Sequence, residues 1–205
     1  MTDFAFGFES FKVENCRSKG DHNDSDWLLL TVTNGETAFP PQTKQIGGNL
    51  HAGDPPVADF FLGPFAIDES KFTTATFCVT NLVHEDDQQA KASGMSVAIF
   101  GGIVAAIGGA GTVVADDDGK IVSAIVGVVG GVIGAIGGLI GLESSDPNCD
   151  GEVFTRVLTF PAGQIAPQSI GPTTETAKSP SECGNDPHTT VTYGIRFFRH
   201  KIPQF

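Results

Sequence analysis

The chain of 205 residues is long enough for one domain with a sizeable core. Only 18% of its residues are charged, yet its net charge is -12 and its isoelectric point is near 4.6. This acidity excludes nucleic acid as a partner, because phosphates would be repelled, and it disfavours electrostatic capture by anionic lipid. The first residues lack the basic start and long apolar stretch of a signal peptide. We therefore expect a soluble form that is cytoplasmic or exported by a non-classical route.

The first part of the chain has the alternating pattern of β-strands. Phenylalanines recur at every second position from Phe4, and the alternation changes phase near Glu9-Ser10, which predicts a β-bulge in the first strand. A loop rich in Pro, Gly and Gln is expected through Pro56. The other strands predicted here are Trp27–Thr33, which the Asn34-Gly35 turn ends, Val57–Ile67 and Phe72–Val83. In the last of these, threonines alternate with apolar residues, which predicts a strand with one solvated face.

Two uncharged apolar stretches, Gly94–Ala115 and Ile121–Leu142, occupy the middle of the chain. Each has about 22 residues, too many for an ordinary strand and enough for a helix to cross a bilayer's hydrocarbon core. An acidic tip separates them, and we expect it to form the turn of a helical hairpin. Glycines of the second stretch recur at spacing four, which on a helix makes a groove for close helix packing. The tip is Asp116, Asp117 and Asp118, and the helix-packing glycines are Gly127, Gly130, Gly131, Gly134, Gly137, Gly138 and Gly141.

Further strands are expected after this insertion, over Val153–Phe160 and Thr189–Phe198, with a Pro/Ser/Thr/Gly loop between them that holds one further short strand. The pattern predicts an α+β fold, in which an antiparallel β-sandwich of about six or seven strands is interrupted by the Gly-rich apolar helical hairpin. We expect a single domain over residues 1–205. Its sandwich body comprises residues 1–84 and 148–205, and the inserted αα-hairpin comprises residues 85–146.

Several short motifs resemble a group of uncharacterised bacterial proteins with a β-sandwich body and an inserted Gly-rich apolar segment. The run Phe11–Ser18, followed by Asn23–Trp27, is similar to the opening of those proteins, where a strand leads through an N-x-R-S…D-x-D loop into a second strand. Asn148–Val153, after the apolar middle, and the late Cys183-Gly184 are also similar. The resemblance implies a shared architecture of body and insert, and it implies no activity.

One candidate metal site and one candidate disulfide follow from the side chains. Oxygen ligands crowd into one predicted inter-strand loop, at Asp21, Asn23, Asp24 and Asp26, which suits Ca²⁺ as the one candidate cofactor. The alternative is a solvated turn with side chain-to-backbone hydrogen bonds. Cys149 and Cys183 lie in loops and are the candidate disulfide pair, with reduced thiols as the alternative. No arrangement of Ser, His, Cys or carboxylates matches a catalytic motif, so we expect a protein that is not an enzyme.

The hairpin admits three interpretations. Its helices could form a buried layer over one face of the sheet, insert into a membrane, or join copies of the chain into an oligomer or fibre. We expect a non-enzymatic protein whose partner is a membrane or a second copy of itself, with pore formation by self-association of the hairpin. The alternative is a soluble self-assembling structural protein, or a Ca²⁺- or ligand-binding β-sandwich module with the hairpin packed as core.

Overall fold

A computed structural model describes residues 1–16, 24–81, 151–178 and 188–200 of the chain. These residues form nine strands, and the strands pair antiparallel throughout. The strands are β1 (Thr2–Asn15), β2 (Asp24–Asn34), β3 (Thr37–Ala38), β4 (Gln42–Leu50), β5 (Val57–Ile67), β6 (Thr73–Asn81), β7 (Gly151–Phe160), β8 (Gln168–Lys178) and β9 (His188–Arg199).

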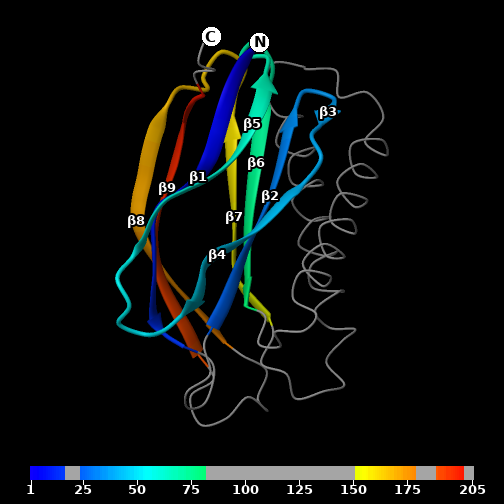
Figure 1. The fold of residues 1–205 in the computed structure, drawn as a ribbon. Helices are drawn as coiled ribbons and strands as arrows, with labels where there is room; N and C mark the ends of the chain where they lie inside the picture. Colours follow the sequence, from blue (N-terminus) through cyan, green and yellow to red (C-terminus); the bar gives the residue numbers. More distant parts are fainter. Residues whose placement is uncertain (17–23, 82–150, 179–187, 201–205) are drawn as a thin grey trace.

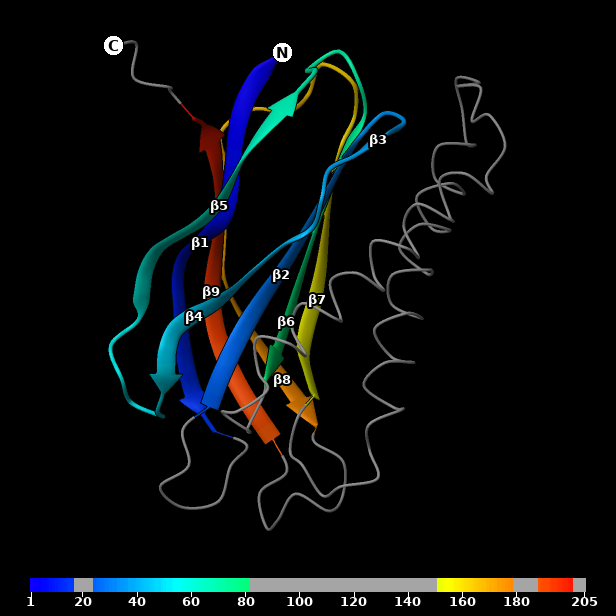
Figure 2. The same cartoon turned by 45° about the vertical axis from the view of Figure 1, so that its right-hand side comes forward.

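The strands form two sheets that pack face to face as a β-sandwich (Figures 1 and 2). One sheet has the strand order β5-β1-β9-β8 and is called here the β1 sheet. The other has the order β3-β2-β6-β7, with β4 also paired to β2, and is called the β6 sheet. The chain passes between the sheets several times, so each sheet combines strands from separate parts of the sequence.

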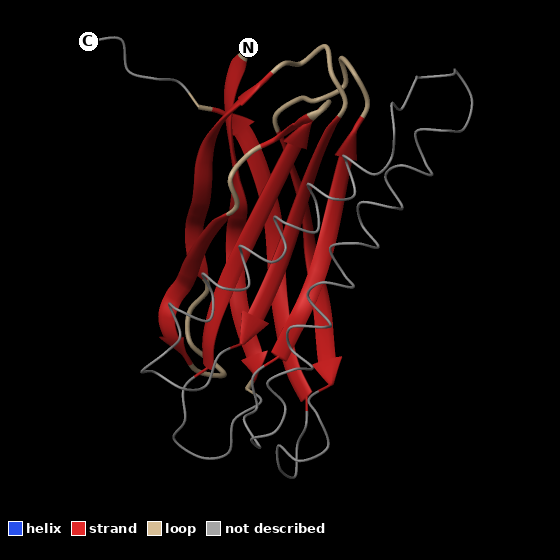
Figure 3. Ribbon diagram, turned by 90° about the vertical axis from the view of Figure 1, so that its right-hand side faces the viewer, coloured by secondary structure: helices blue, strands red, loops and turns tan. Residues whose placement is uncertain are grey.

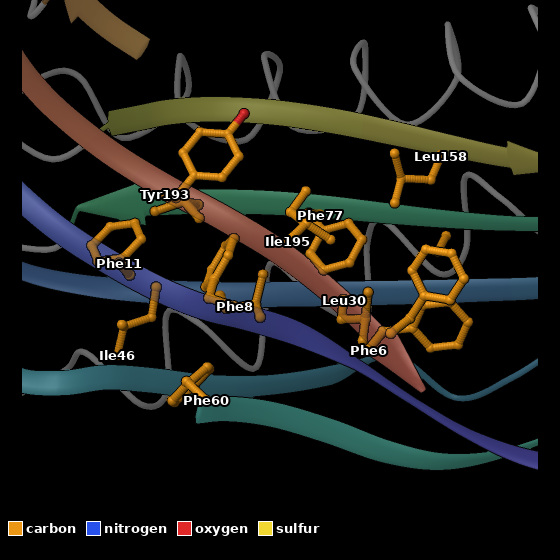
Figure 4. Packing of buried hydrophobic residues seen from close by; sticks show 14 of the residues in the cluster. Phe6, Phe8, Phe11, Leu30, Ile46, Phe60, Phe77, Leu158, Tyr193 and Ile195 are labelled. Atoms are coloured by element: carbon orange, nitrogen blue, oxygen red, sulfur yellow. The ribbon is translucent and has the colours of Figure 1, made fainter. Parts of the chain in front are cut away.

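The inner face of β1 supplies the centre of the core. Phe4, Phe6, Phe8 and Phe11 are all fully buried on this face. The pairing of β1 with β9 shifts between Phe8 and Ser10, which confirms the predicted β-bulge and explains how Phe11 returns to the inner side. Aromatic side chains from both sheets meet here, as Figure 4 shows. The core is therefore closed mainly by phenylalanine rings.

Rings from β6, β7 and β9 complete this cluster. The ring of Phe8 lies 5.3 to 6.2 Å from those of Phe11, Phe77, Phe154 and Tyr193. Phe154 of β7 and Tyr193 of β9 stack with ring centroids 4.2 Å apart. The pairs of Phe8 with Phe77 and with Phe154, and the pair of Phe154 with Tyr193, join the two sheets directly, because each sheet contributes one ring to each pair.

The described residues correct the predicted fold class. They contain strands and no helix, so this part of the protein is all-β rather than α+β. The predicted helical hairpin, residues 85–146, lies outside the described residues. The hairpin was inferred from the length of the apolar stretches and from their glycine spacing. The α+β class was then assigned to the whole chain because of this one predicted helical segment. The β-sandwich itself is confirmed.

Two predicted loops also contain strands. The stretch expected to be a loop through Pro56 holds β3 and β4, and the later loop, in which one short strand was expected, holds the 11-residue β8. In β4 the side chain of Ile46 is fully buried, while most of its neighbours are polar or glycine, so the strand carries almost no alternation of its own. This strand forms because it pairs with β2, and a strand that depends on pairing is hard to recognise from its own residues.

Candidate functional site: the outer face of the β6 sheet

The β6 sheet has a second face, directed away from the core, that is built mainly from threonines. Antiparallel partners point to the same side of a sheet, so the register of β2, β6 and β7 places their alternate residues in rows across this face. We call it the outer face. Its residues are Trp27, Leu29, Thr31 and Thr33 of β2, Thr74, Thr76, Cys78 and Thr80 of β6, Thr155, Val157 and Thr159 of β7, and Thr43 and Gln45 of β4. None of these side chains is charged.

This outer face is buried at its centre. The sequence predicted a solvated threonine face on β6, and that prediction is wrong, because all nine residues of β6 are buried. Thr76 has 4% of its surface exposed, Cys78 has 1% and Leu29 has 4%. None of the three belongs to the core cluster between the sheets, which contains their inward-facing neighbours instead. The burial therefore lies on the side of the sheet that faces away from the core, and Figure 3 views the strands of the β6 sheet from that side.

Threonines on the outer side of the other sheet are in a different environment. Thr174 and Thr176 of β8 are exposed, and their hydroxyls lie 3.0 and 3.1 Å from those of Thr192 and Thr190 on β9. This is the environment expected for the solvated face of a two-layer sandwich. The contrast shows that burial of the β6 sheet's outer face is not a general property of the fold.

Polar atoms on the outer face lack hydrogen-bond partners. The indole Nε1 of Trp27 and the hydroxyl oxygens of Thr43 and Thr155 are buried without any partner. A buried polar group without a hydrogen bond costs about 1–3 kcal/mol. The three atoms belong to β2, β4 and β7, so they are spread across the outer face.

The calcium candidates lie in a different setting from the one predicted. Strand β2 begins at Asp24, so Asp24 and Asp26 are strand residues rather than loop residues. Asp26 is buried, and the amide Nδ2 of Asn81 donates to its Oδ1 over 3.5 Å. Asp21, Asn23 and the side chain of Asp24 lie outside the described part. Among the described residues, no group of three or more His, Cys, Asp or Glu could hold a metal ion.

The single tyrosine of the chain has a large pKa shift. Burial, followed by the negative charge of Glu175, raises the pKa of Tyr193 to about 12, although Arg156 acts in the opposite direction. The phenol oxygen of Tyr193 donates to Oε1 of Glu175 over 3.4 Å. At neutral pH the phenol is therefore protonated and acts as a donor that closes the edge between β7 and β8.

The charged contacts of Glu69 tie strand ends together. The hydroxyl of Thr2 donates to Oε1 of Glu69 over 2.6 Å, and Arg199 donates to Oε2 over 2.8 Å. The hydrogen bond from Thr2 is the largest cause that lowers the pKa of Glu69, and the hydrogen bond and charge of Arg199 add to it. These contacts join the start of β1, the β5–β6 loop and the end of β9. They are structural contacts at an exposed end of the sandwich.

The other predicted site residues lie outside the described part of the chain. They are the tip residues Asp116–Asp118, the seven spaced glycines between Gly127 and Gly141, and the candidate disulfide pair Cys149 and Cys183. One feature of the sequence indicates that the outer face is covered. In the run Leu28-Leu29-Leu30, the middle leucine must point away from the core if its neighbours point into it. An apolar residue at that position indicates that something covers it.

Within residues 1–16, 24–81, 151–178 and 188–200, the structure has no helix long and apolar enough to cross a membrane. The resemblance to uncharacterised bacterial proteins stays a prediction. Comparison of the chain with protein-family models, with curated proteins and with solved structures finds no match in any of the three.

Proposed function

We propose that this protein is a non-enzymatic membrane-interacting protein whose apolar segment, residues 94–142, enters a lipid bilayer, and that self-association of this segment there forms pores. The observation that carries the proposal is the place where the segment enters the sandwich. Strands β6 and β7 on either side of it are neighbours, paired from Thr73 with Phe160 to Asn81 with Gly151. The segment is thus inserted between two strands that already pair along their whole length.

Among the described residues, the strands outside the inserted segment form both sheets and a core between them. This core cluster comes from the described strands and from the loop that holds Ile165. If residues 94–142 moved into a bilayer, no strand would be withdrawn from either sheet, and the aromatic contacts across the core would remain. This topology supports a folded body that keeps its structure in both states.

The composition of the segment supports lipid as its destination. Residues 94–115 and 121–142 carry no charge, and each stretch is about as long as the hydrocarbon core requires. Between them lie Asp116–Asp118, whose neighbouring carboxylates repel one another, so that acid favours their protonation. Neutral carboxyl groups enter hydrocarbon at lower cost than charged ones. We therefore expect membrane entry to increase as the pH falls.

The test is release of a trapped dye from liposomes between about pH 4.5 and 7.5, with neutral and with anionic lipids. The wild-type protein should release dye, more at the acidic end, and replacing Asp116–Asp118 by Asn should reduce the dependence on pH. Gly134→Leu should abolish release, because it removes a small residue from the spaced glycines through which copies would approach closely. Ala58→Leu, at an exposed position of β5, adds the same side chain to the body and should release dye like the wild type.

Absence of dye release at every pH and from every lipid mixture would overturn the proposal. Size-exclusion chromatography with light scattering separates it from the alternative function. A large species that persists on dilution in the absence of detergent would identify a soluble self-assembling protein instead.

A further inference from the structure

We propose that the outer face of the β6 sheet is the docking surface for this chain's own apolar segment, residues 94–142. The proposal concerns the protein in water and does not depend on whether the segment ever enters a membrane. It explains why a threonine-rich sheet face with the composition of a solvated surface is nevertheless buried.

The cover of this face belongs to the same chain. The buried surfaces of Thr76, Cys78 and Leu29 are those of a single protein molecule, with no second copy present. The described elements that contact β2, β6 and β7 are their neighbours in the sheet and, toward the core, strands of the β1 sheet. Neither group lies over the outer face. The cover must therefore come from residues 17–23, 82–150, 179–187 or 201–205.

Only one of these four stretches matches the outer face in size. The face spans four strands about 4.8 Å apart and four rows of side chains, an area of roughly 15 by 20 Å. Residues 17–23, 179–187 and 201–205 are each shorter than ten residues, and the first two are mostly polar. The stretch 82–150 begins directly after Asn81 of β6 and ends directly before Gly151 of β7, two strands that form the middle and one side of this face.

The chemistry of the two surfaces is complementary. The outer-face residues named above carry no charge, although Glu152 is the pairing partner of Thr80 at one end of β7, and residues 94–115 and 121–142 carry no charge either. The side chains of the threonines and of Cys78 are small, so the central rows of the outer face are nearly flat. A glycine-rich partner can approach such a surface closely. Leu29, Val157 and Trp27 supply apolar area to this contact. An apolar segment of this length would otherwise expose a large hydrophobic surface to water.

The single tryptophan of the chain reports on the docked state, because Trp27 lies at one end of the outer face. Acrylamide quenching of its fluorescence should be several-fold slower in the folded wild-type protein than in urea, since the indole is shielded. Thr76→Arg places an unpaired charge in the centre of the contact, which should expel the segment and bring quenching close to the unfolded value. Thr192→Arg, on the outer side of the β1 sheet, is the matched control and should quench like the wild type.

A cross-linking experiment identifies the segment and does not depend on a destabilising variant. A diazirine-bearing leucine analogue in place of Leu29 keeps the size of the side chain, and irradiation should link it to a peptide within residues 94–142. Thr76→Arg should remove this product, with circular dichroism as the check that the sheets remain folded. If Thr76→Arg does not fold, the cross-link in the otherwise wild-type chain decides the question by itself.

The proposal is wrong if the analogue at position 29 links to another stretch of the chain or to none. It is also wrong if Trp27 is quenched in the folded wild type as fast as in urea, or if a folded Thr76→Arg variant quenches like the wild type. All these measurements are made without lipid. A docked segment together with absence of dye release would therefore refute the membrane function and leave the docking surface intact.

Discussion

Phe8 is the side chain on which the packing of the two sheets depends most directly, and its truncation to alanine tests the core. The ring is fully buried, and four other rings surround it at centroid distances of 5.3 to 6.2 Å. Replacing a buried Phe by Ala costs about 3–5 kcal/mol. Each aromatic pair adds about 0.5–1.5 kcal/mol beyond its buried area, so we expect Phe8→Ala near the upper end of that range. A typical domain has only about 5–15 kcal/mol in total, so much of its stability would be lost.

Phe198→Ala is the matched control, because Phe198 lies on the outer side of the β1 sheet. Its ring is half-buried against Phe61 at 4.9 Å, and Arg196 lies 5.6 Å above it. Partial burial and one ring contact predict a loss of roughly 1–2 kcal/mol. Urea unfolding followed by circular dichroism and by Trp27 fluorescence measures both variants. Equal losses for the two variants would refute the view that Phe8 joins the two sheets.

Two further predictions concern the β1 sheet and use matched probes. A Cβ atom at Gly7 would overlap the carbonyl oxygen of Phe60 and lie 2.7 Å from Cα of Phe61, whereas at Gly194 its nearest neighbour would be Oγ of Ser10 at 3.4 Å. In urea unfolding we expect Gly7→Ala to cost about 2–3 kcal/mol or more, and Gly194→Ala to change stability by less than about 1 kcal/mol; similar losses would contradict the close approach of β5. The second prediction is that the ultraviolet absorbance of tyrosinate shows Tyr193 titrating near 12 in the folded protein, against its ordinary value of 10.0. Because the unfolded chain loses this proton first, its contribution to stability should be complete below about pH 10 and lost as the pH rises through 12; titration at the ordinary value in the folded state would show that the phenol is solvated.

The sequence predicts strands well where apolar residues alternate and the core lies on one side. The phenylalanines of β1, its bulge and the alternation of β9 all follow from side chains that must reach the same core. Strand β4 was missed because it contains Gly47-Gly48 and only one buried isoleucine before its last residue, so it is formed by pairing with β2 rather than by a pattern of its own. Strand β8 was expected to be short because Gly171, Pro172 and three threonines give it the composition of a loop.

The environment of the threonine face could not be predicted from alternation alone. Threonine alternating with apolar residues gives the same pattern whether its side of the sheet meets water or another part of the chain. The alternation of Thr74 and Thr76 with Ala75 therefore establishes two faces without showing what lies on the second. Leu29 on the neighbouring strand carries that information, because it is an apolar residue at an outward position. The outer face is recognised only when both strands are placed in register.

The choice of threonine on this face supports a cover that can leave. A sheet face that is always buried is usually rich in Val, Ile and Leu, and exposing such a face would create an aggregation-prone surface. A face that is always solvated usually carries charges, and burying these without partners would be costly. Threonine has a methyl group for packing and a hydroxyl group that water can satisfy, so Thr31, Thr76 and Thr80 are tolerated in both states. The unpartnered hydroxyls of Thr43 and Thr155 would gain hydrogen bonds to water when the cover leaves, which offsets part of the lost apolar contact. A threonine face would therefore keep the free-energy difference between the covered and uncovered sheet small, which the proposed movement of the segment from the sheet into a bilayer would require.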